Sequence, residues 1–252
     1  LADAGLSVPA QQVAGTPEEN AAFLAEHGAV VVKPARGEQG KGVAVDLRTT
    51  EEIEAAIAAA REFSNVVLQE EMAAGDDLRI IVIGNEVVAG AIRKPAEIVG
   101  TGLHSVAELI ERQSRRRAAA TGGESRIPVD GETQRCLAAE GVTMETVLAE
   151  GRTLRVRRTA NLHTGGTIHD VTSELHAGLC RAAVEAARAL DMPVVGMDLM
   201  VPDVHAGAYH IIEANERPGL ANHAPAPTAQ RFIDLLFPQT ARRSARTKKK
   251  SY

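Results

Sequence analysis

Residues 29–46 read AVVVKPARGEQGKGVAVD, and this stretch decides the fold. Each end is a short Val-rich run that predicts a buried strand, and the middle carries Gly37, Gly40 and Gly42. The two common glycine motifs that bind phosphate both require a strand that runs directly into a helix. Here the glycines join two strands, so the pattern predicts a hairpin flap whose backbone amides point toward an anion. The alternative is a hairpin tip that binds nothing.

Lys33 lies at the end of the first of these strands, directly before the flap. A charge at the end of an apolar strand needs a partner, because an unpaired buried charge is costly. A bound phosphate is one such partner. Lys33 and the flap together therefore predict a phosphate site.

The segments around the flap alternate between helix and strand patterns. Capping boxes predict helix starts at Thr16–Glu19, Thr49–Glu52 and Ser105–Glu108. Further helices are expected near 174–190 and over 228–236, and strands over 66–69, 78–83, 86–92, 154–158, 194–201 and 209–214. The basic stretch 113–126 predicts a mobile loop. Helices that alternate with strands and hairpins indicate an α+β class with mixed sheets.

Composition argues against several function classes. The 252 residues allow one large domain or two small ones. Aromatic residues make up only 2%, which argues against nucleic-acid binding by base stacking. The sequence contains no apolar run near the roughly 20 residues that cross a bilayer, so no membrane partner is expected. Two Cys form neither a disulfide framework nor a four-Cys zinc site, and a cytoplasmic setting is expected.

The two ends of the sequence carry separate expectations. Leu1 reads as the middle of a helix, which predicts a further N-terminal domain in a longer chain. The last eleven residues hold six Lys or Arg and no acid. Residues 241–252 are therefore predicted to be a disordered basic tail, with an arm for nucleic acid or an acidic partner as the alternative.

A second set of polar residues predicts a metal site. Asp198 lies within an apolar strand pattern, and Glu213 and Asn215 are two residues apart, so they share one face of the next strand. If these strands pair, three oxygen-bearing side chains converge. Oxygen ligands of this kind favour Mg²⁺ or Mn²⁺. The alternative is a set of strand-end residues that face water.

A third set is basic. Arg155, Arg157 and Arg158 fall on the strand expected over 154–158, where alternation puts Arg155 and Arg157 on one face. Such a face predicts capture of a phosphate or of an oxyanion that develops during a reaction. An exposed strand face is the alternative. The same two interpretations apply to Arg79 and Arg93 at strand ends.

The order of these features resembles the ATP-grasp superfamily over about residues 5–238. The matching order is the lysine strand, the glycine flap, the segment 69–72, and then Asp198 before Glu213-x-Asn215. A closer resemblance, to cyanophycin synthetases and bifunctional glutathione synthetases, rests on the stretches 93–100, 154–167, 170–172 and 213–219. Within that branch the sequence is most similar to N-acetylglutaminylglutamine synthetases.

The resemblance implies a role for each matching residue. The implied nucleotide contacts are Lys33, the flap with Gly37, Gly40 and Gly42, the hinge Gln69, Glu70, Glu71 and Met72, then Asp77 and Arg79. The implied catalytic residues are Arg157, Arg93 and Asn161. The implied ligands of two Mg²⁺ ions, with Mn²⁺ as the substitute, are Asp198, Glu213 and Asn215.

The same resemblance implies an α+β ATP-grasp fold in which two α+β subdomains, 1–72 and 73–240, grip ATP between mixed or antiparallel sheets. The implied activity is an ADP-forming, ATP- and Mg²⁺-dependent carboxylate–amine ligase that acts through an acyl-phosphate on small amino-acid or peptide substrates. Two alternatives stay open, which are ligation of amino acids to a protein or polymer and a non-catalytic nucleotide-binding regulatory domain. A homo-oligomer is also left open.

Overall fold

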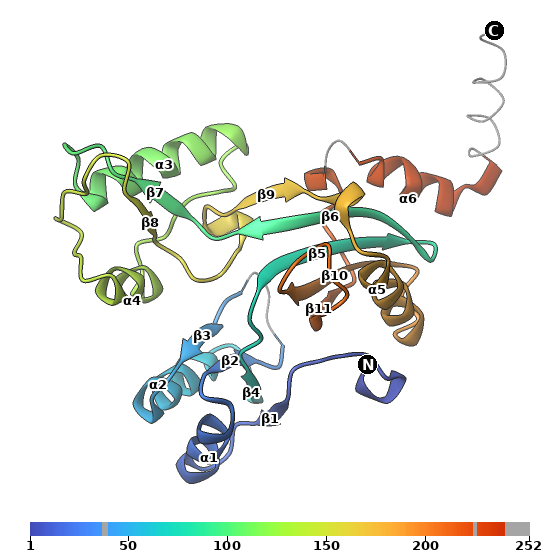
Figure 1. Cartoon of the computed structure of the whole chain (residues 1–252), viewed down its shortest axis with the longest axis horizontal. Helices are drawn as coiled ribbons and strands as arrows, with labels where there is room; N and C mark the ends of the chain where they lie inside the picture. The colour runs from blue at the N-terminus through green and yellow to red at the C-terminus, as the bar shows by residue number, and fades with distance from the viewer. Residues whose placement is uncertain (37–39, 224–225, 240–252) are drawn as a thin grey trace, which may run out of the picture. The chain divides into compact units, whose positions relative to one another are not determined.

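The computed structural model describes residues 1–36, 40–223 and 226–239 (Figure 1). Gly37 of the flap and the predicted tail, residues 241–252, lie outside the described residues. The chain forms two compact units, each assembled from segments that are distant in sequence. Unit 1 comprises Leu1–Val8, Ala73–Ile92 and Ile168–Tyr252, and unit 2 comprises Pro9–Met72 and Arg93–Thr167. The division into subdomains 1–72 and 73–240 stays a prediction.

Unit 1 is built on a five-stranded sheet with the order β11-β10-β5-β6-β9 (Figure 1). Its strands are β5 (Asp76–Ile83), β6 (Glu86–Lys94), β9 (Thr167–Asp170), β10 (Val194–Val201) and β11 (His210–Asn215). Strand β10 is antiparallel to both of its neighbours, β5 and β11. The turn between β5 and β6 lies between the strands expected over 78–83 and 86–92, and its Gly84 and Asn85 both adopt positive φ angles.

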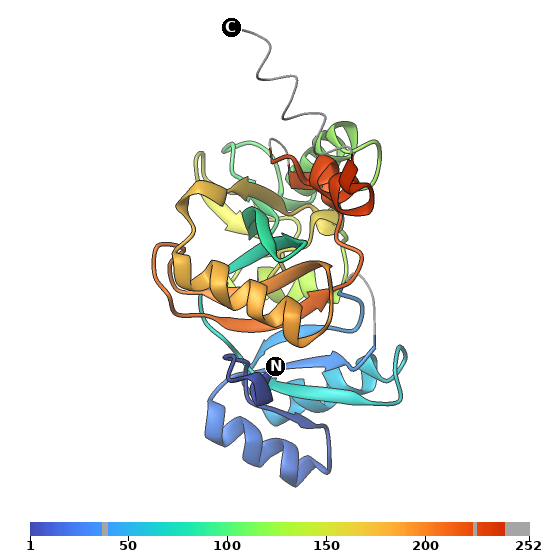
Figure 2. The same ribbon diagram turned by 90° about the vertical axis from the view of Figure 1, so that its right-hand side faces the viewer.

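Two helices cover opposite faces of this sheet. The first is α5 (Ala177–Ala189), which Figure 2 shows running across the strands. Its Leu179 packs in one core with Leu78, on one face of β5. Helix α6 (Thr228–Leu236) packs through Phe232 and Leu235 against Ile81 and Ile83, on the other face. Side chains alternate along a strand, so the polar odd-numbered residues of β5 lie on the α6 face.

Unit 2 begins with a four-stranded sheet of order β1-β4-β2-β3. Its elements are β1 (Gln11–Val13), α1 (Pro17–His27), β2 (Val30–Pro34), β3 (Ala44–Leu47), α2 (Thr50–Ala60) and β4 (Val67–Glu71). Val30 and Val32 pack in one core with Ile53 and Ile57 of α2. The predicted lysine strand is therefore confirmed, and Ile53, Ala56, Ile57 and Ala60 form the buried face of α2.

The rest of unit 2 forms a second core. Strand β7 (Glu97–Val99) pairs antiparallel with β8 (Thr153–Arg155), and helices α3 (Val106–Ala120) and α4 (Gly131–Ala139) pack nearby. Ile98, Leu109, Leu137 and Leu154 share this core. The described chain also contains four short 3₁₀ helices, which are η1 (Ala2–Ala4), η2 (Leu162–Thr164), η3 (Thr172–Glu174) and η4 (Leu220–His223). Across the described ranges, the helices are too short or too polar to cross a membrane.

The three predicted capping boxes are all present. Helices α1, α2 and α3 begin after Thr16, Thr49 and Ser105, and each of these side chains accepts a hydrogen bond from the backbone of the third helical residue. In each case the side chain of a Glu accepts a hydrogen bond from the backbone N–H of the capping residue. Local hydrogen bonding therefore fixed these three helix starts.

Two expectations about local structure were wrong. The stretch 113–126 is not a loop throughout, because α3 continues to Ala120. Its Arg and Ala residues favour helix, and Ser114 is buried, so the helix ends only before Gly122 and Gly123. The strand expected over 154–158 stops at Arg155, where β8 ends. Helix α4 was not predicted at all.

Candidate functional site

Arg79 and Asp198 are register partners on β5 and β10 of unit 1. Arg79 Nε and Nη2 donate to Asp198 Oδ1 and Oδ2 at 2.6 and 2.7 Å. Asp198 is buried, and Arg79 is largely shielded from water. Two parallel bonds between a planar guanidinium and a carboxylate fix the orientation of both groups.

Glu213 and Asn215 join Asp198 on the same sheet face. Asp198 pairs in register with Glu213, and Gly196 pairs with Asn215, so the predicted pairing of the two strands is confirmed. Asn215 Nδ2 donates to Asp198 Oδ2 at 3.3 Å, and Glu213 is exposed at the surface of unit 1. Three oxygen-bearing side chains therefore lie beside one another, with Arg79 as their neighbour.

This donor set fits a divalent cation that prefers oxygen. Among the residues that the structure describes, no group of three or more His, Cys, Asp and Glu side chains is placed to hold a metal. The candidate set instead consists of two carboxylates, from Asp198 and Glu213, and the amide of Asn215. Mg²⁺ in proteins is usually bound by one or two carboxylates together with substrate phosphate oxygens. The chemistry of the set therefore suits Mg²⁺ better than a transition metal that needs His or Cys.

Asp77 lies on the same face as Arg79, since it pairs with Met200 two positions along the same register. The chain enters β5 through Gly75, whose φ is 128°. A Cβ at Gly75 would lie 2.3 Å from the carbonyl oxygen of Val201, so only glycine fits there. This close approach of two backbone segments at Gly75 helps to fix the position of Asp77 in β5.

Lys33 pairs with Glu70 within unit 2. Lys33 Nζ lies 2.7 Å from Glu70 Oε2, and the pair sits on the face of the sheet opposite the α2 core. The side chain of Glu70 is 9% exposed and that of Lys33 is 21% exposed. The structure thus gives Lys33 a partner from the predicted hinge, and a bound phosphate as its partner stays a prediction.

The other hinge side chains serve the packing of unit 2. Gln69 is buried, donates to the carbonyl of Asn20 at 3.2 Å and accepts from Gln12 at 3.0 Å. Glu71 Oε2 accepts from the backbone N–H of Ala10 at 3.1 Å. These bonds tie β4 to β1 and α1. Met72, the last hinge residue, is exposed at the end of this segment.

Arg157 is held by Asp130 and Glu132, two acidic residues that are not among the predicted site residues. Its Nη1 lies 2.5 Å from Asp130 Oδ1, and its Nη2 lies 2.6 Å from Glu132 Oε2. Arg157 is buried and Arg155 is exposed, so the predicted shared face of these two arginines is wrong. The reason is that β8 ends at Arg155, so the alternation of a strand does not extend to Arg157. Asp130 is the N-cap of α4, and the Asp-Gly-Glu-Thr pattern was the signal available in the sequence.

The described part of the flap lies beside Asn161. Gly40 and Gly42 both have positive φ angles, and a Cβ at Gly40 would lie 3.7 Å from Asn161 Nδ2. Asn161 also caps η2, because its Oδ1 accepts from His163 N at 2.9 Å. Arg93 is partly buried near the end of β6. Asn161 and the flap are thus neighbours within unit 2.

A cavity of about 600 Å³ lies within unit 2. It is bordered by the flap, by one side of α2, and by the start of α4 with Arg157. Its charged lining residues are Lys41, Glu52, Glu62, Asp130, Glu132, Arg135 and Arg157. The cavity therefore carries both signs of charge, and it brings the predicted flap and Arg157 to one space.

Part of the chain matches the model of a known protein family. Residues 1–103 match the RimK-like ATP-grasp domain family.

The chain has the ATP-grasp fold.

Sequence relatives of this ATP-grasp chain come from the branch that the motifs indicated. The cyanophycin synthetase of Nostoc sp. (strain PCC 7120) is 33% identical over 222 residues, which cover 83% of this chain and 25% of that protein. The glutathione biosynthesis bifunctional protein of Pasteurella multocida is 31% identical over 262 residues, which cover 95% of this chain and 34% of that protein. The chain thus spans about a quarter to a third of these relatives.

Solved structures agree on the ATP-grasp fold. The bifunctional glutathione synthetase from Pasteurella multocida has a TM-score of 0.59 at 28% identity, covering 94% of this chain and 35% of that one. The D-alanine–D-alanine ligase from Bacillus anthracis has a TM-score of 0.58 at 15% identity, covering 99% of this chain and 66% of that one. The second likeness shows the fold alone. The predicted α+β ATP-grasp fold is therefore confirmed.

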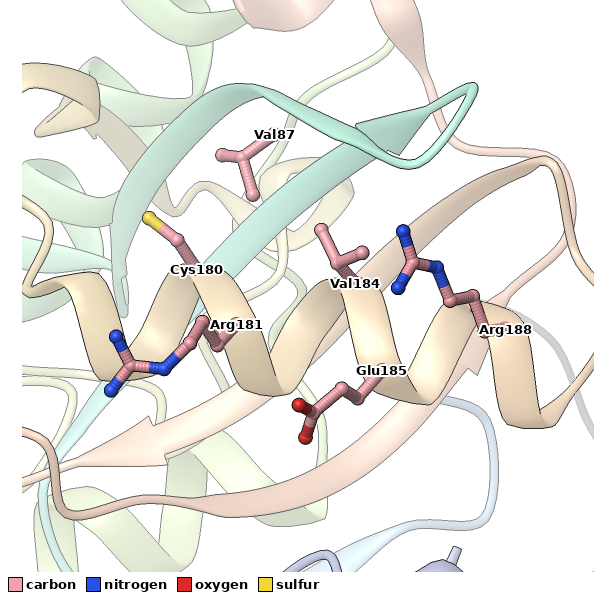
Figure 3. Close-up of a pocket in the computed structure, with 6 residues that line it drawn as sticks. All are labelled: Val87, Cys180, Arg181, Val184, Glu185 and Arg188. Atoms are coloured by element: carbon pink, nitrogen blue, oxygen red, sulfur yellow. The ribbon is translucent and has the colours of Figure 1, made fainter.

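The ATP-grasp chain has a further hollow in unit 1, of about 370 Å³, between α5 and β6. Figure 3 shows the Cys180 and Val184 side chains reaching toward Val87, with the guanidinium groups of Arg181 and Arg188 toward opposite ends. Glu185 completes the described lining. The residues predicted to bind nucleotide or metal are not among those that line it, so this hollow is separate from the candidate site.

Proposed function

We propose that this chain is the ATP-grasp core of an ADP-forming, ATP- and Mg²⁺-dependent carboxylate–amine ligase. The observation that carries the proposal is the cluster on one face of the unit 1 sheet, where Asp198, Glu213 and Asn215 lie together beside Arg79. Two carboxylates and an amide, next to a fixed guanidinium, are suited to a nucleotide triphosphate with its divalent cation. The names of the relatives support the same reaction class.

In the proposed reaction a substrate carboxylate attacks the γ-phosphate of ATP and forms an acyl-phosphate, with ADP as the leaving group. An amine then attacks the acyl carbon, and phosphate leaves as the amide bond forms. Asp198, Glu213 and Asn215 would hold Mg²⁺, which when bound neutralises charge on the phosphate oxygens. Arg79 fixes the orientation of Asp198 for that purpose.

Within unit 2, Lys33 and Arg157 are the two cations proposed to contact phosphate groups. Lys33 and Glu70 are in contact on one sheet face. In the proposed site Lys33 would give up this contact for one with a nucleotide phosphate. Arg157, held by Asp130 and Glu132, would contact the transferred phosphoryl group or the acyl-phosphate. A fixed guanidinium such as that of Arg157 stabilises a transition state because it needs no rearrangement during the reaction.

The proposed substrates are an amino acid or small peptide as the acid and an amino acid as the amine. The resemblance to N-acetylglutaminylglutamine synthetases makes an acetylated glutamine dipeptide the first product to test. The cavity beside Arg157 carries both acidic and basic residues, which suits a zwitterionic amino acid as the amine substrate.

The test is ADP release with a panel of amino acids and dipeptides, with products identified by mass spectrometry. Glu213→Gln is expected to lower turnover about a hundredfold and to leave the unfolding midpoint unchanged, because Glu213 is exposed. Glu216→Gln, at another exposed carboxylate just beyond β11, is the matched control and is expected to turn over normally. Normal turnover of Glu213→Gln at saturating Mg²⁺ would overturn the metal assignment. A wild-type chain that consumes no ATP with any acid and amine pair would overturn the function.

A further inference from the structure

Residues at the start of α4 bind the Arg157 side chain and hold it in one orientation. Asp130 Oδ1 accepts from the backbone N–H groups of Glu132 and Thr133, both at 3.1 Å, and thereby caps the helix. The same oxygen accepts from Arg157 Nη1 at 2.5 Å. Arg157 Nη1 also lies 3.3 Å from Thr133 Oγ1, which donates to the carbonyl of Pro128 at 2.6 Å. One cap oxygen therefore fixes both the helix start and one end of the guanidinium.

Glu132 holds the other end of the guanidinium and the backbone that follows it. Its Oε2 lies 2.6 Å from Arg157 Nη2. Its Oε1 accepts from the backbone N–H of Arg158 at 2.9 Å and from that of Thr159 at 3.1 Å. Both oxygens of one partly buried carboxylate are thus used to place residues 157–159.

The next residue ties the same segment to the strand after the flap. Arg158 Nη1 bonds to Asp46 Oδ2 in β3. Residues 157–159 are therefore held from two sides within unit 2, by α4 and by β3. A change at α4 is expected to move Arg157 relative to the flap side of the cavity.

Stability alone does not account for this arrangement. Asp130 is half-exposed, but the side chains of Arg157 and Glu132 are only 7% and 13% exposed, and removing such a pair of charges from water is expensive. Apolar residues of similar size would serve packing as well. The network does give an orientation, because a planar guanidinium bonded at both ends cannot rotate.

We propose that Glu132 and Asp130 are positioning residues that fix Arg157 for phosphoryl transfer. The proposal rests on the proposed function for its chemistry, and on the hydrogen bonds above for its geometry. A displacement of about 1 Å in a positioned group costs on the order of a hundredfold in rate. Loss of one carboxylate partner is therefore expected to lower kcat more than it raises the KM for ATP.

The first test needs no turnover. Exchange of the Arg157 guanidinium N–H protons with water is measured by NMR in the full chain, with the signal assigned by its loss in Arg157→Lys. Glu132→Gln is expected to speed this exchange at least about tenfold, because the amide cannot hold Arg157 Nη2 and both backbone N–H groups as a carboxylate does. Glu140→Gln, at the exposed far end of α4, is the matched control and is expected to leave it unchanged.

Asp130→Asn is the second variant, because Asn caps a helix as well as Asp and keeps α4 intact while the charge is lost. Unchanged exchange in both Glu132→Gln and Asp130→Asn would overturn the proposal.

The second readout is steady-state kinetics. A fall in kcat of at least about tenfold, with the KM for ATP within about threefold of wild type, supports positioning. Lower unfolding midpoints with normal kcat would show a structural role only and overturn it. If the wild-type chain consumes no ATP, the proposed function fails, and the NMR measurement still decides whether Glu132 holds Arg157.

Discussion

Arg79 and Asp198 form a doubly hydrogen-bonded ion pair across neighbouring strands, although they are 119 residues apart in sequence. The exposed fractions of their side chains are 17% and 6%, so the pair is largely out of water. The strand register alone puts the two residues opposite each other. Any function of Asp198 therefore depends on the correct pairing of β5 with β10.

Asp198→Asn is expected to destabilise the chain by about 3–5 kcal/mol, because it leaves the Arg79 charge buried without a full counter-charge. Urea unfolding followed by circular dichroism measures this. Arg155→Gln is the control, since the pair of Arg155 with Glu97 has an N–O distance of 3.8 Å and is exposed. Its cost is expected to be about 0–1 kcal/mol. Equal unfolding free energies for the two variants would contradict the account.

Substitutions at Lys33 and at Glu70 are expected to have different effects on nucleotide affinity. Lys33→Met is expected to weaken binding of a non-hydrolysable ATP analogue about tenfold, because it removes a cation from the proposed phosphate site. Glu70→Gln removes the carboxylate that now holds Lys33 and is expected to leave that affinity unchanged or stronger. Titration calorimetry with Mg²⁺ present measures both. If both variants lose affinity equally, the pair is structural and Lys33 does not change partner.

Ser105 controls the ionisation of Glu108 at the start of α3. Hydrogen bonds from the backbone and then the side chain of Ser105 lower the pKa of Glu108. A carboxyl with a lowered folded-state pKa stabilises the fold above its unfolded pKa, and this contribution is lost as the pH falls through the folded value. Ser105→Ala is expected to raise the pKa of Glu108 toward its ordinary value. Carboxyl NMR titration of both chains checks this, and an unmoved pKa would mean that the side-chain bond has no effect.

The two cysteines are expected to react slowly. Burial raises the pKa of the thiols of Cys136 and Cys180, so both stay protonated at neutral pH, and the thiolate is the reactive form. Cys180 is partly exposed and Cys136 is buried, so Cys180 is expected to be alkylated first and faster as the pH rises. Mass spectrometry of iodoacetamide-treated protein follows both sites, with urea-unfolded protein as the control. Earlier alkylation of Cys136 would contradict the packing around α4.

Much of the fold followed from local sequence. The capping boxes at Thr16, Thr49 and Ser105 are recognisable because cap and partner are three residues apart. The Gly84-Asn85 turn and the buried face of α2 are equally local. The end of α3 was misplaced because a basic stretch without an apolar stripe resembles a loop, although its Arg and Ala residues favour helix.

The sequence by itself determined which residue types were available: a lysine before a glycine flap, oxygen-bearing side chains on two late strands, and arginines near residue 157. Only the tertiary structure decided their partners, which are Glu70 for Lys33, Asp198 for Arg79, and Asp130 with Glu132 for Arg157. Periodicity reports which way a side chain points along its own element. It carries no information about which distant strand or helix end lies opposite, and that neighbour decides whether a charge is solvated or held in place.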